Sequence, residues 1–329
     1  MVCDLLIKNG AIYTMDDGIP YAEWVAVADG KILALGMGDA AYIEAKSVID
    51  LKGKVVLPGL IDSHMHGTAT GEALNAVDVA PENCVQDVID LIAKACEKPG
   101  EEWVFASGLN IPDLKEERAP YRWELDEVTN EHPVIIKNVT LHGNVFNTKG
   151  FELVDVPENL KGIVCTEDGR KTGEFASDDS AFLAAGNAVM LQPDSLLMKY
   201  IEDTVNYCAS QGLTTISALD GGLFDSTDRD VFMWINGKDK YPIHVETFFQ
   251  MENAHLAKAL GLPRIGDCLC LDGAGFEGTM AMREPYNDGE FPTGILYWSD
   301  ERLYKFLWTA NKMGLQTAMH ALGDVALDQ

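Results

Sequence analysis

Two histidines separated by one residue, His64 and His66, close an apolar stretch that begins at Val55. Side chains alternate along a β-strand with a period of two, so we expect both imidazoles to project from one face. Two imidazole nitrogens close together suit a borderline divalent ion such as zinc. The alternative is a polar strand end whose histidines hydrogen-bond to water and backbone. The apolar lead-in and the flanking Gly59 and Gly67 favour the carboxyl end of a buried strand, where α/β enzymes build their sites.

The ten residues 58–67 read Pro-Gly-Leu-Ile-Asp-Ser-His-Met-His-Gly. They resemble the first barrel strand of the amidohydrolase superfamily. More narrowly, the chain resembles the branch that includes N-substituted formamide deformylases and metal-dependent hydrolases of unknown substrate. Four further stretches carry the resemblance, which runs from the first residue to the last: 123–126 (Trp-Glu-Leu-Asp), 141–144 (Leu-His-Gly-Asn), 285–288 (Pro-Tyr-Asn-Asp) and 320–324 (His-Ala-Leu-Gly-Asp). The resemblance implies a TIM-type (β/α)8 barrel that binds divalent metal.

A third metal ligand is expected at His320, which ends a predicted strand and begins the stretch that resembles the family's fifth-strand motif. Its alternative role is that of a hydrogen-bonded structural histidine. Asp324, four residues later, is predicted to cap the following helix by accepting backbone N–H groups.

The fourth donor position departs from the family pattern. The family commonly has a lysine on the fourth strand, shortly before an Asp-Gly pair, which can be carboxylated to bridge two metals. Cys268 aligns with that lysine here, and Cys268, Cys270 and Asp272 share one strand face by the period of two. A thiolate is a good zinc ligand. The alternatives are that both cysteines are small core residues, or that the site holds one metal and no bridge. We therefore expect one or two divalent ions, with zinc favoured.

Other polar residues carry weaker signals. His142 resembles a family motif near the substrate, where an imidazole could steady a carbonyl or its oxyanion, and a loop hydrogen bond is the alternative. His244 and Glu246 share a strand face and either line the barrel or pair outside it. Asp62 shares the face of His64 and is a candidate for orienting a ligand. The family's sixth-strand histidine and eighth-strand aspartate, the latter a proton shuttle, have no counterpart, so the general base is expected outside this chain.

Short strands with tight turns are predicted before the His-x-His stretch. Apolar runs mark them at residues 4–12, 24–28, 31–35 and 47–51. Asp29-Gly30 is a hairpin signal because both residues tolerate positive φ. Residues 1–57 are therefore predicted to form the N-terminal part of a small β-sandwich.

Regular alternation of strands and helices begins near residue 195. Strands are predicted at residues 213–219, 243–249, 268–271 and 315–320. A helix that starts at Ser299 or Asp300 and ends at Gly314 precedes the last of them. This repetition predicts a parallel sheet or barrel. Residues 58–67 and 196–329 would form the barrel, and residues 68–195 an insertion between its first and second strands, with a helix that ends at Pro99-Gly100.

The predicted barrel is incomplete, because only about its first five strands of eight can be assigned. A half barrel would leave strand edges and apolar faces in water. We expect either that the natural chain continues beyond Gln329 or that a second polypeptide supplies the C-terminal remainder of the barrel. The first is favoured.

Composition sets broad limits on function. Hydrophobic residues make up 47% of the 329 and charged residues 23%, which is typical of a globular protein, and neither a membrane-spanning run nor a signal peptide is evident. A cytoplasmic location is expected. The net charge of −27 argues against nucleic acid or an anionic membrane as partner. Seven scattered cysteines indicate a reducing compartment rather than a disulfide framework.

The sequence thus predicts a hydrolase that cleaves a carbon–nitrogen bond of a small amide or formamide through hydroxide formed on its metal. A deaminase of an amino-heterocycle is the alternative within the superfamily. A barrel scaffold or fragment that has lost its site is the alternative outside catalysis, and Cys268 in place of lysine and the absent late strands favour it. The intact His64, His66 and His320 favour the enzyme. A small-molecule substrate is expected, and a homo-oligomer is left open.

Overall fold

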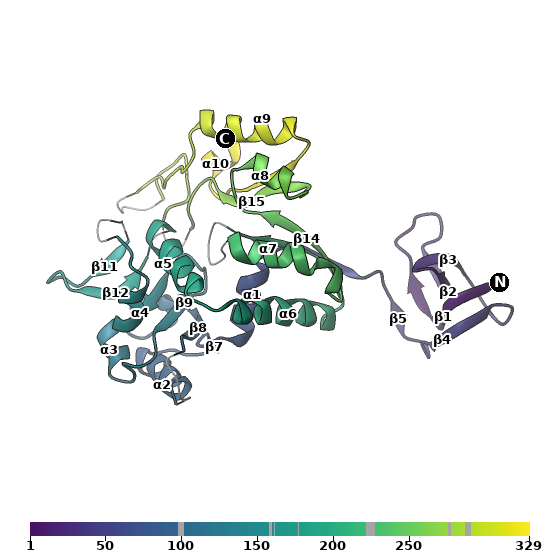
Figure 1. Ribbon diagram of the computed structural model, residues 1–329, viewed down its shortest axis with the longest axis horizontal. Helices are drawn as coiled ribbons and strands as arrows, with labels where there is room; N and C mark the ends of the chain where they lie inside the picture. Colours follow the sequence, from purple (N-terminus) through teal and green to yellow (C-terminus); the bar gives the residue numbers. More distant parts are fainter. Residues whose placement is uncertain are drawn as a thin grey trace. The chain divides into compact units, whose positions relative to one another are not determined.

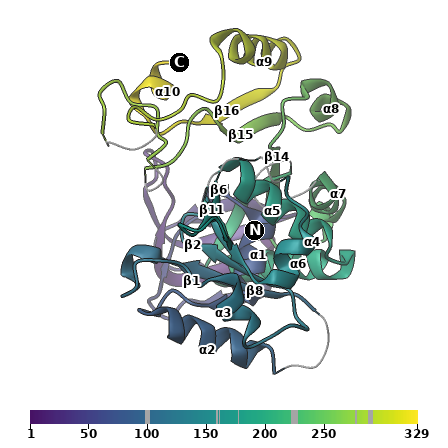
Figure 2. The same ribbon diagram turned by 90° about the vertical axis from the view of Figure 1, so that its left-hand side faces the viewer.

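The computed structural model describes residues 1–97, 102–157, 160, 162–176, 178–221, 228–275, 278–286 and 291–329. The chain divides into two compact units, Met1–Ile61 and Asp62–Gln329 (Figures 1 and 2). In the part of the chain that the structure describes, no helix is both long and apolar enough to cross a bilayer.

The first unit is a five-stranded sheet, drawn in purple in Figure 1. Its strands are β1 (Val2–Tyr13), β2 (Tyr21–Ala28), β3 (Lys31–Gly36), β4 (Glu44–Asp50) and β5 (Val55–Val56), in the order β3-β2-β1-β4 with β5 also paired to β1. The predicted hairpin is confirmed, because Asp29 and Gly30 connect the antiparallel β2 and β3 with φ values of 51° and 71°. The strands of residues 1–57 all belong to this one sheet, and the β-sandwich stays a prediction.

A parallel sheet in the second unit contains the His-x-His stretch. Its order is β16-β15-β14-β13-β6. The strands are β6 (Leu60–Met65), β13 (Leu213–Asp220), β14 (His244–Phe249), β15 (Arg264–Cys270) and β16 (Gln316–His320). The pairs β13–β14, β14–β15 and β15–β16 are parallel. These are the five predicted barrel strands in chain order, and they form a partial barrel.

β15 begins four residues before its predicted start. The alternating pattern is broken there by Gly266, which has φ 95°. A Cβ atom at this glycine would lie 2.5 Å from the carbonyl oxygen of Ala318 in β16, so a larger residue would push the two strands apart. The pairing with β16 also shifts register between Gly266 and Cys270.

Helices lie between the strands of the parallel sheet and after the last of them. They are α1 (Gly67–Asn75), α6 (Asp194–Ser210), α7 (Asp228–Gly237), the short η2 (Lys238–Lys240), α8 (Ala254–Ala259), α9 (Asp300–Lys312) and α10 (Asp324–Asp328). The predicted Ser299 cap of α9 is confirmed, because its side chain accepts a hydrogen bond from the Arg302 N–H. Figure 2 shows α9 beside β15 and β16.

The predicted cap of α10 is wrong. Gly323 is the N-cap residue, and Asp324 is the first residue of the helix. The Asp324 carboxylate accepts the N–H of Arg283 at 2.9 Å. The buried Asp272 instead accepts the N–H groups of Leu322 and Gly323, at 2.9 and 2.7 Å, and so stabilises the turn before α10.

Residues 68–195 contain a second, mixed sheet of six strands in the order β11-β12-β10-β9-β8-β7. The strands are β7 (Val77–Asp78), β8 (Val104–Leu109), β9 (Val134–Asn138), β10 (Asn144–Phe146), β11 (Ile163–Cys165) and β12 (Lys171–Phe175). The helices are α2 (Val85–Ala95), η1 (Ile111–Asp113), α3 (Arg122–Asp126), α4 (Thr148–Leu153) and α5 (Asp178–Met190). α2 ends at Ala95 with Cys96 as its C-cap, and the Pro99-Gly100 pair at which its end was predicted lies outside the described residues.

Alternating side chains of this second sheet pack into two separate cores. Val104, Val134 and Ile136 pack against the apolar face of α2. Their neighbours Phe105 and Ile135 point the other way and pack with alanines of α5. Since successive residues of a strand face opposite sides, the sheet lies between helical layers and residues 68–195 contain apolar cores of their own.

Candidate metal centre

β6 carries His64 and places His66 directly after its last residue, Met65. His66 has an extended backbone, with φ −80° and ψ 94°, and precedes α1. The two imidazole centroids are 5.6 Å apart and the ring planes meet at 88°. His64 is exposed and His66 is half-buried, so the pair borders on solvent.

Cys268 of β15 joins this pair. One nitrogen of His64, one nitrogen of His66 and the Cys268 sulfur all lie within 4.8 Å of one another. Cys268 is only 3% exposed, whereas His64 is open to solvent. The three side chains therefore form a cluster with one buried and one accessible side.

The cluster depends on the curvature of the parallel sheet. β15 and β6 are three places apart in the order β16-β15-β14-β13-β6. Three steps of about 4.8 Å would place them roughly 14 Å apart in a flat sheet. Donor atoms from both strands within 4.8 Å of one another fit a sheet that is curled like a barrel wall.

The surroundings of Cys268 favour its thiolate. A hydrogen bond from the Cys270 side chain holds the pKa of the Cys268 thiol well below its usual range, and a hydrogen bond and positive charge from His66 act in the same direction. Burial opposes this shift but is outweighed. An anionic sulfur is the form that binds metal.

His320 ends β16, next to β15. It lies opposite Cys270 in the pairing of the two strands, and its charge also lowers the pKa of Cys268. Its Nδ1 atom is buried and has no hydrogen-bond partner among the described residues. His320 is not one of the three residues whose donor atoms lie within 4.8 Å of one another.

A buried polar corner that the sequence did not suggest fixes the chain just after His66. Asp220, the last residue of β13 and 1% exposed, accepts the Thr68 N–H at 3.0 Å. The indole N–H of Trp234 donates to the Thr68 hydroxyl, also at 3.0 Å. A Cβ atom at Gly67 would lie 2.4 Å from the Trp234 ring, so only glycine fits. Burial raises the pKa of Asp220, while its hydrogen bonds to Thr68 oppose that rise.

Gln250 was also missed. It directly follows β14, is 1% exposed, and its Nε2 atom lies 3.4 Å from His66 Nδ1. Asp220 is the last residue of β13 and Gln250 directly follows β14, so both are polar residues at the strand ends where barrel enzymes place their sites. That position was the signal from which both could have been found.

The donor set fits a divalent metal. Two imidazoles and one thiolate bind zinc in preference to hard cations such as magnesium. The buried, unpartnered Nδ1 of His320 offers a further nitrogen donor near the same strand ends. A family model described as the amidohydrolase family matches residues 47–329. The chain belongs to the amidohydrolase family.

Several proteins are similar to this chain. N-substituted formamide deformylase of Arthrobacter pascens is 23% identical over 99% of this chain and 64% of its own length. Protein LONG AFTER FAR-RED 3 of Arabidopsis thaliana is 26% identical over all of this chain and 60% of its own length. Adenine deaminase of Dehalococcoides mccartyi is 29% identical over 56% of this chain and 34% of its own length. The chain thus spans less than two thirds of these relatives.

A solved structure agrees with the fold of this chain. An uncharacterized metal-dependent hydrolase from Pyrococcus horikoshii superposes with a TM-score of 0.76 and is 25% identical. The match covers 98% of this chain and 66% of the other.

His142 lies in the loop between β9 and β10. Its ring centroid is 5.5 Å from that of Phe182 in α5. Phe182 in turn packs against a cluster formed by Leu219, Phe248, Cys268 and Cys270. The structure therefore links His142 to the candidate centre through one aromatic ring.

Other candidates lie elsewhere or serve other contacts. His244 and Glu246 bond to each other at 2.8 Å at the start of β14. The Asp62 carboxylate accepts the backbone N–H of His64 at 3.1 Å. Asn287 and Asp288 of the stretch 285–288 lie outside the described residues.

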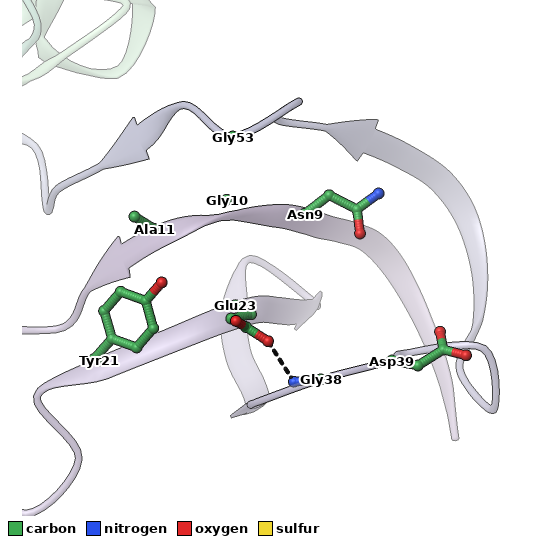
Figure 3. Close-up of a pocket in the computed structure, with 8 residues that line it drawn as sticks. All are labelled: Asn9, Gly10, Ala11, Tyr21, Glu23, Gly38, Asp39 and Gly53. Atoms are coloured by element: carbon green, nitrogen blue, oxygen red, sulfur yellow. Dashed lines mark hydrogen bonds between the residues drawn. The ribbon is translucent and has the colours of Figure 1, made fainter.

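A recess in the first unit does not resemble a metal centre (Figure 3). It is lined by Asn9, Gly10, Ala11, Tyr21, Glu23, Gly38, Asp39 and Gly53. The Glu23 carboxylate already accepts the Gly38 N–H at 2.6 Å. With no histidine or cysteine in its lining, the recess offers no borderline metal donor.

Proposed function

We propose that this chain forms the metal-binding part of a hydrolase that cleaves a carbon–nitrogen bond in a small amide or formamide. His64, His66 and Cys268 would hold the metal, with His320 as a further ligand. The observation that carries the proposal is the convergence of three donor atoms within 4.8 Å of one another. Zinc is the preferred ion because the donors are imidazole nitrogen and thiolate sulfur.

The metal, when bound, would polarise a carbonyl group and lower the pKa of water, the activation that amide hydrolysis requires. Cys268 contributes the negative charge of the ligand set, and its low pKa keeps that charge at neutral pH. The Asp220–Thr68–Trp234 corner holds the backbone on which His66 sits. His142 is proposed as a substrate contact, since its ring adjoins Phe182 and Phe182 packs on the Cys268 cluster.

The choice of bond rests on the relatives. The N-substituted formamide deformylase aligns with nearly the whole chain, which supports a formamide or related amide. The adenine deaminase aligns with 56% of it, so deamination of an amino-heterocycle is the second candidate. Both reactions use activated water on a carbon bonded to nitrogen, so the same ligands would serve either.

The test combines elemental analysis with a substrate panel. Purified protein should contain about one or two zinc-like ions per chain. Metal-loaded protein is then offered N-formyl amines, N-acyl amines and adenine. Release of amine from the first two supports the proposal, and release of ammonia from adenine favours the deaminase. Protein that binds no divalent metal contradicts both candidates.

A further inference from the structure

Gln250 contacts the imidazole ring of His66, one of the three residues of the candidate metal centre. The contact joins Gln250 Nε2 and His66 Nδ1 at 3.4 Å. The Gln250 main chain is fixed independently, because its N–H donates to the carbonyl oxygen of Asp220 at 3.1 Å. A side chain that is 1% exposed has no bulk water as an alternative partner.

The amide of Gln250 is free to present either end to His66. Its Oε1 atom is buried and has no hydrogen-bond partner within the described residues. The oxygen and nitrogen of a glutamine amide have nearly the same shape. Turning the amide by half a rotation therefore exchanges the two ends and breaks no hydrogen bond other than the one to His66.

Whether Gln250 presents its amide nitrogen or its amide oxygen decides which nitrogen of His66 carries the proton. A neutral imidazole has one N–H group and one lone pair. If the amide donates to Nδ1, the proton sits on Nε2 and blocks it as a ligand. If the amide oxygen accepts from Nδ1–H, the Nε2 lone pair is open. Ligating histidines almost always donate their second N–H to a neighbouring acceptor, which fixes the tautomer.

We infer that Gln250 is a positioning residue that accepts the Nδ1–H of His66 through Oε1 and thereby keeps Nε2 open as the metal donor. The inference rests on the metal centre of the proposed function. Gln250, at the end of β14, would thus support metal binding by the donors from β6 and β15.

Two substitutions at the same position separate this role from simple packing. Gln250→Glu keeps an acceptor of the same reach and has no N–H donor. Gln250→Met keeps the approximate shape and has neither. The zinc dissociation constant, measured by competition with a chelator, should be about 10- to 100-fold weaker in Gln250→Met, as for loss of other partners of ligating histidines. Gln250→Glu should restore binding at least to the wild-type level.

A matched control is available at Gln316, the exposed first residue of β16. Gln316→Met makes the same chemical change at the start of its strand and should leave zinc binding unchanged. Thermal unfolding of each metal-free variant shows whether it is folded. Nitrogen-15 spectra of the histidine rings in zinc-loaded protein, with His66 assigned by its loss in His66→Asn, should show a proton on Nδ1 in the wild type and in Gln250→Glu.

The outcomes distinguish this inference from the proposed function. Zinc binding equally weak in Gln250→Glu and Gln250→Met, or a proton on Nε2 of His66 in the zinc-loaded wild type, overturns the role of Gln250 and leaves the metal centre standing. Wild-type protein that binds no zinc overturns the centre itself. Zinc binding with the expected order of variants but no hydrolysis supports the role of Gln250 and contradicts only the catalytic part of the proposal.

Discussion

Lys137 and Glu72 form an ion pair whose Nζ and Oε1 atoms are 2.6 Å apart, and their side chains are only 4% and 6% exposed. Glu72 lies on α1, the helix that follows the His-x-His strand, and Lys137 lies on β9 of the six-stranded sheet. The pair therefore joins the helix beside the candidate metal centre to the sheet within residues 68–195.

Glu72→Gln should lower the free energy of unfolding by about 3–5 kcal/mol, because it removes the carboxylate charge that pairs with the buried Lys137 ammonium. Urea unfolding measures the change. The control is Lys46→Met, which breaks the exposed ion pair of Lys46 with Asp4. The Lys46 Nζ and Asp4 Oδ1 atoms are 2.7 Å apart. Solvent screens that pair, so no measurable loss is expected. A similar effect of both variants would show that the Lys137–Glu72 pair adds little.

Gly67→Ala should destabilise the protein by about 1–3 kcal/mol and weaken zinc binding, because the added methyl group enters the space of the Trp234 ring next to His66. Gly186 in α5 provides a control of opposite sign. A Cβ atom at Gly186 meets nothing within 4 Å, so Gly186→Ala should stabilise α5 by about 0.5–1 kcal/mol. Calorimetric unfolding and zinc titration of both variants test the pair of expectations. A Gly67→Ala protein as stable as the wild type would contradict the tight fit.

The parallel sheet could be predicted because each of its strands is a local pattern. Stretches with strand patterns such as Leu213–Asp220 alternate with amphipathic helices, and that alternation is visible in the sequence. The six-stranded sheet was harder, since β10, β11 and β12 have only three to five residues and one of them contains Gly173 at φ 96°. Strands so short carry too few alternations to be recognised.

The candidate centre could likewise be predicted only where its residues are close in the sequence. The spacing of His64 and His66 predicts that they share a side of one chain segment, and the structure brings their rings within 5.6 Å. Their approach to Cys268, some 200 residues later, depends on how far the sheet curls, which no local pattern encodes. The family resemblance supplied that proximity. The corner of Asp220 and the contact of Gln250 arise only once the strands lie side by side.

Glu174 of β12 should make stability depend on pH. Burial raises the pKa of its carboxyl group, so the folded protein binds its proton more tightly than the unfolded chain does. The stabilisation from that proton is complete below the unfolded pKa, near 4.5, and is lost as the pH rises through the higher folded pKa. Glu174→Gln should therefore have a higher melting temperature than the wild type at pH 7 and a similar one at pH 4. A constant difference between the two proteins across this range would contradict the shifted pKa.

Cys268→Ser should weaken zinc binding at least about 10-fold, because a hydroxyl group replaces the anionic sulfur donor. Cobalt is a useful replacement for zinc, since a sulfur–cobalt bond gives a charge-transfer band that should be present in the wild type and absent from this variant. Cys3→Ser is the control, because Cys3 is also buried but lies in the first unit. A charge-transfer band that persists in Cys268→Ser would remove Cys268 from the ligand set.

His64→Ala should separate metal binding from folding. His64 is exposed, so the metal-free variant should unfold at nearly the wild-type temperature. Zinc at about 100 times its dissociation constant should stabilise the wild type by about 2.7 kcal/mol, because it binds the folded protein alone. His64→Ala should show no such gain, while His244→Ala, whose histidine pairs with Glu246 at the start of β14, should keep it. The rise in melting temperature on adding zinc measures all three proteins under one set of conditions. Equal stabilisation of the wild type and His64→Ala would place the zinc at another site. Loss of a ligand must weaken zinc binding to the folded protein and so reduce the stabilisation.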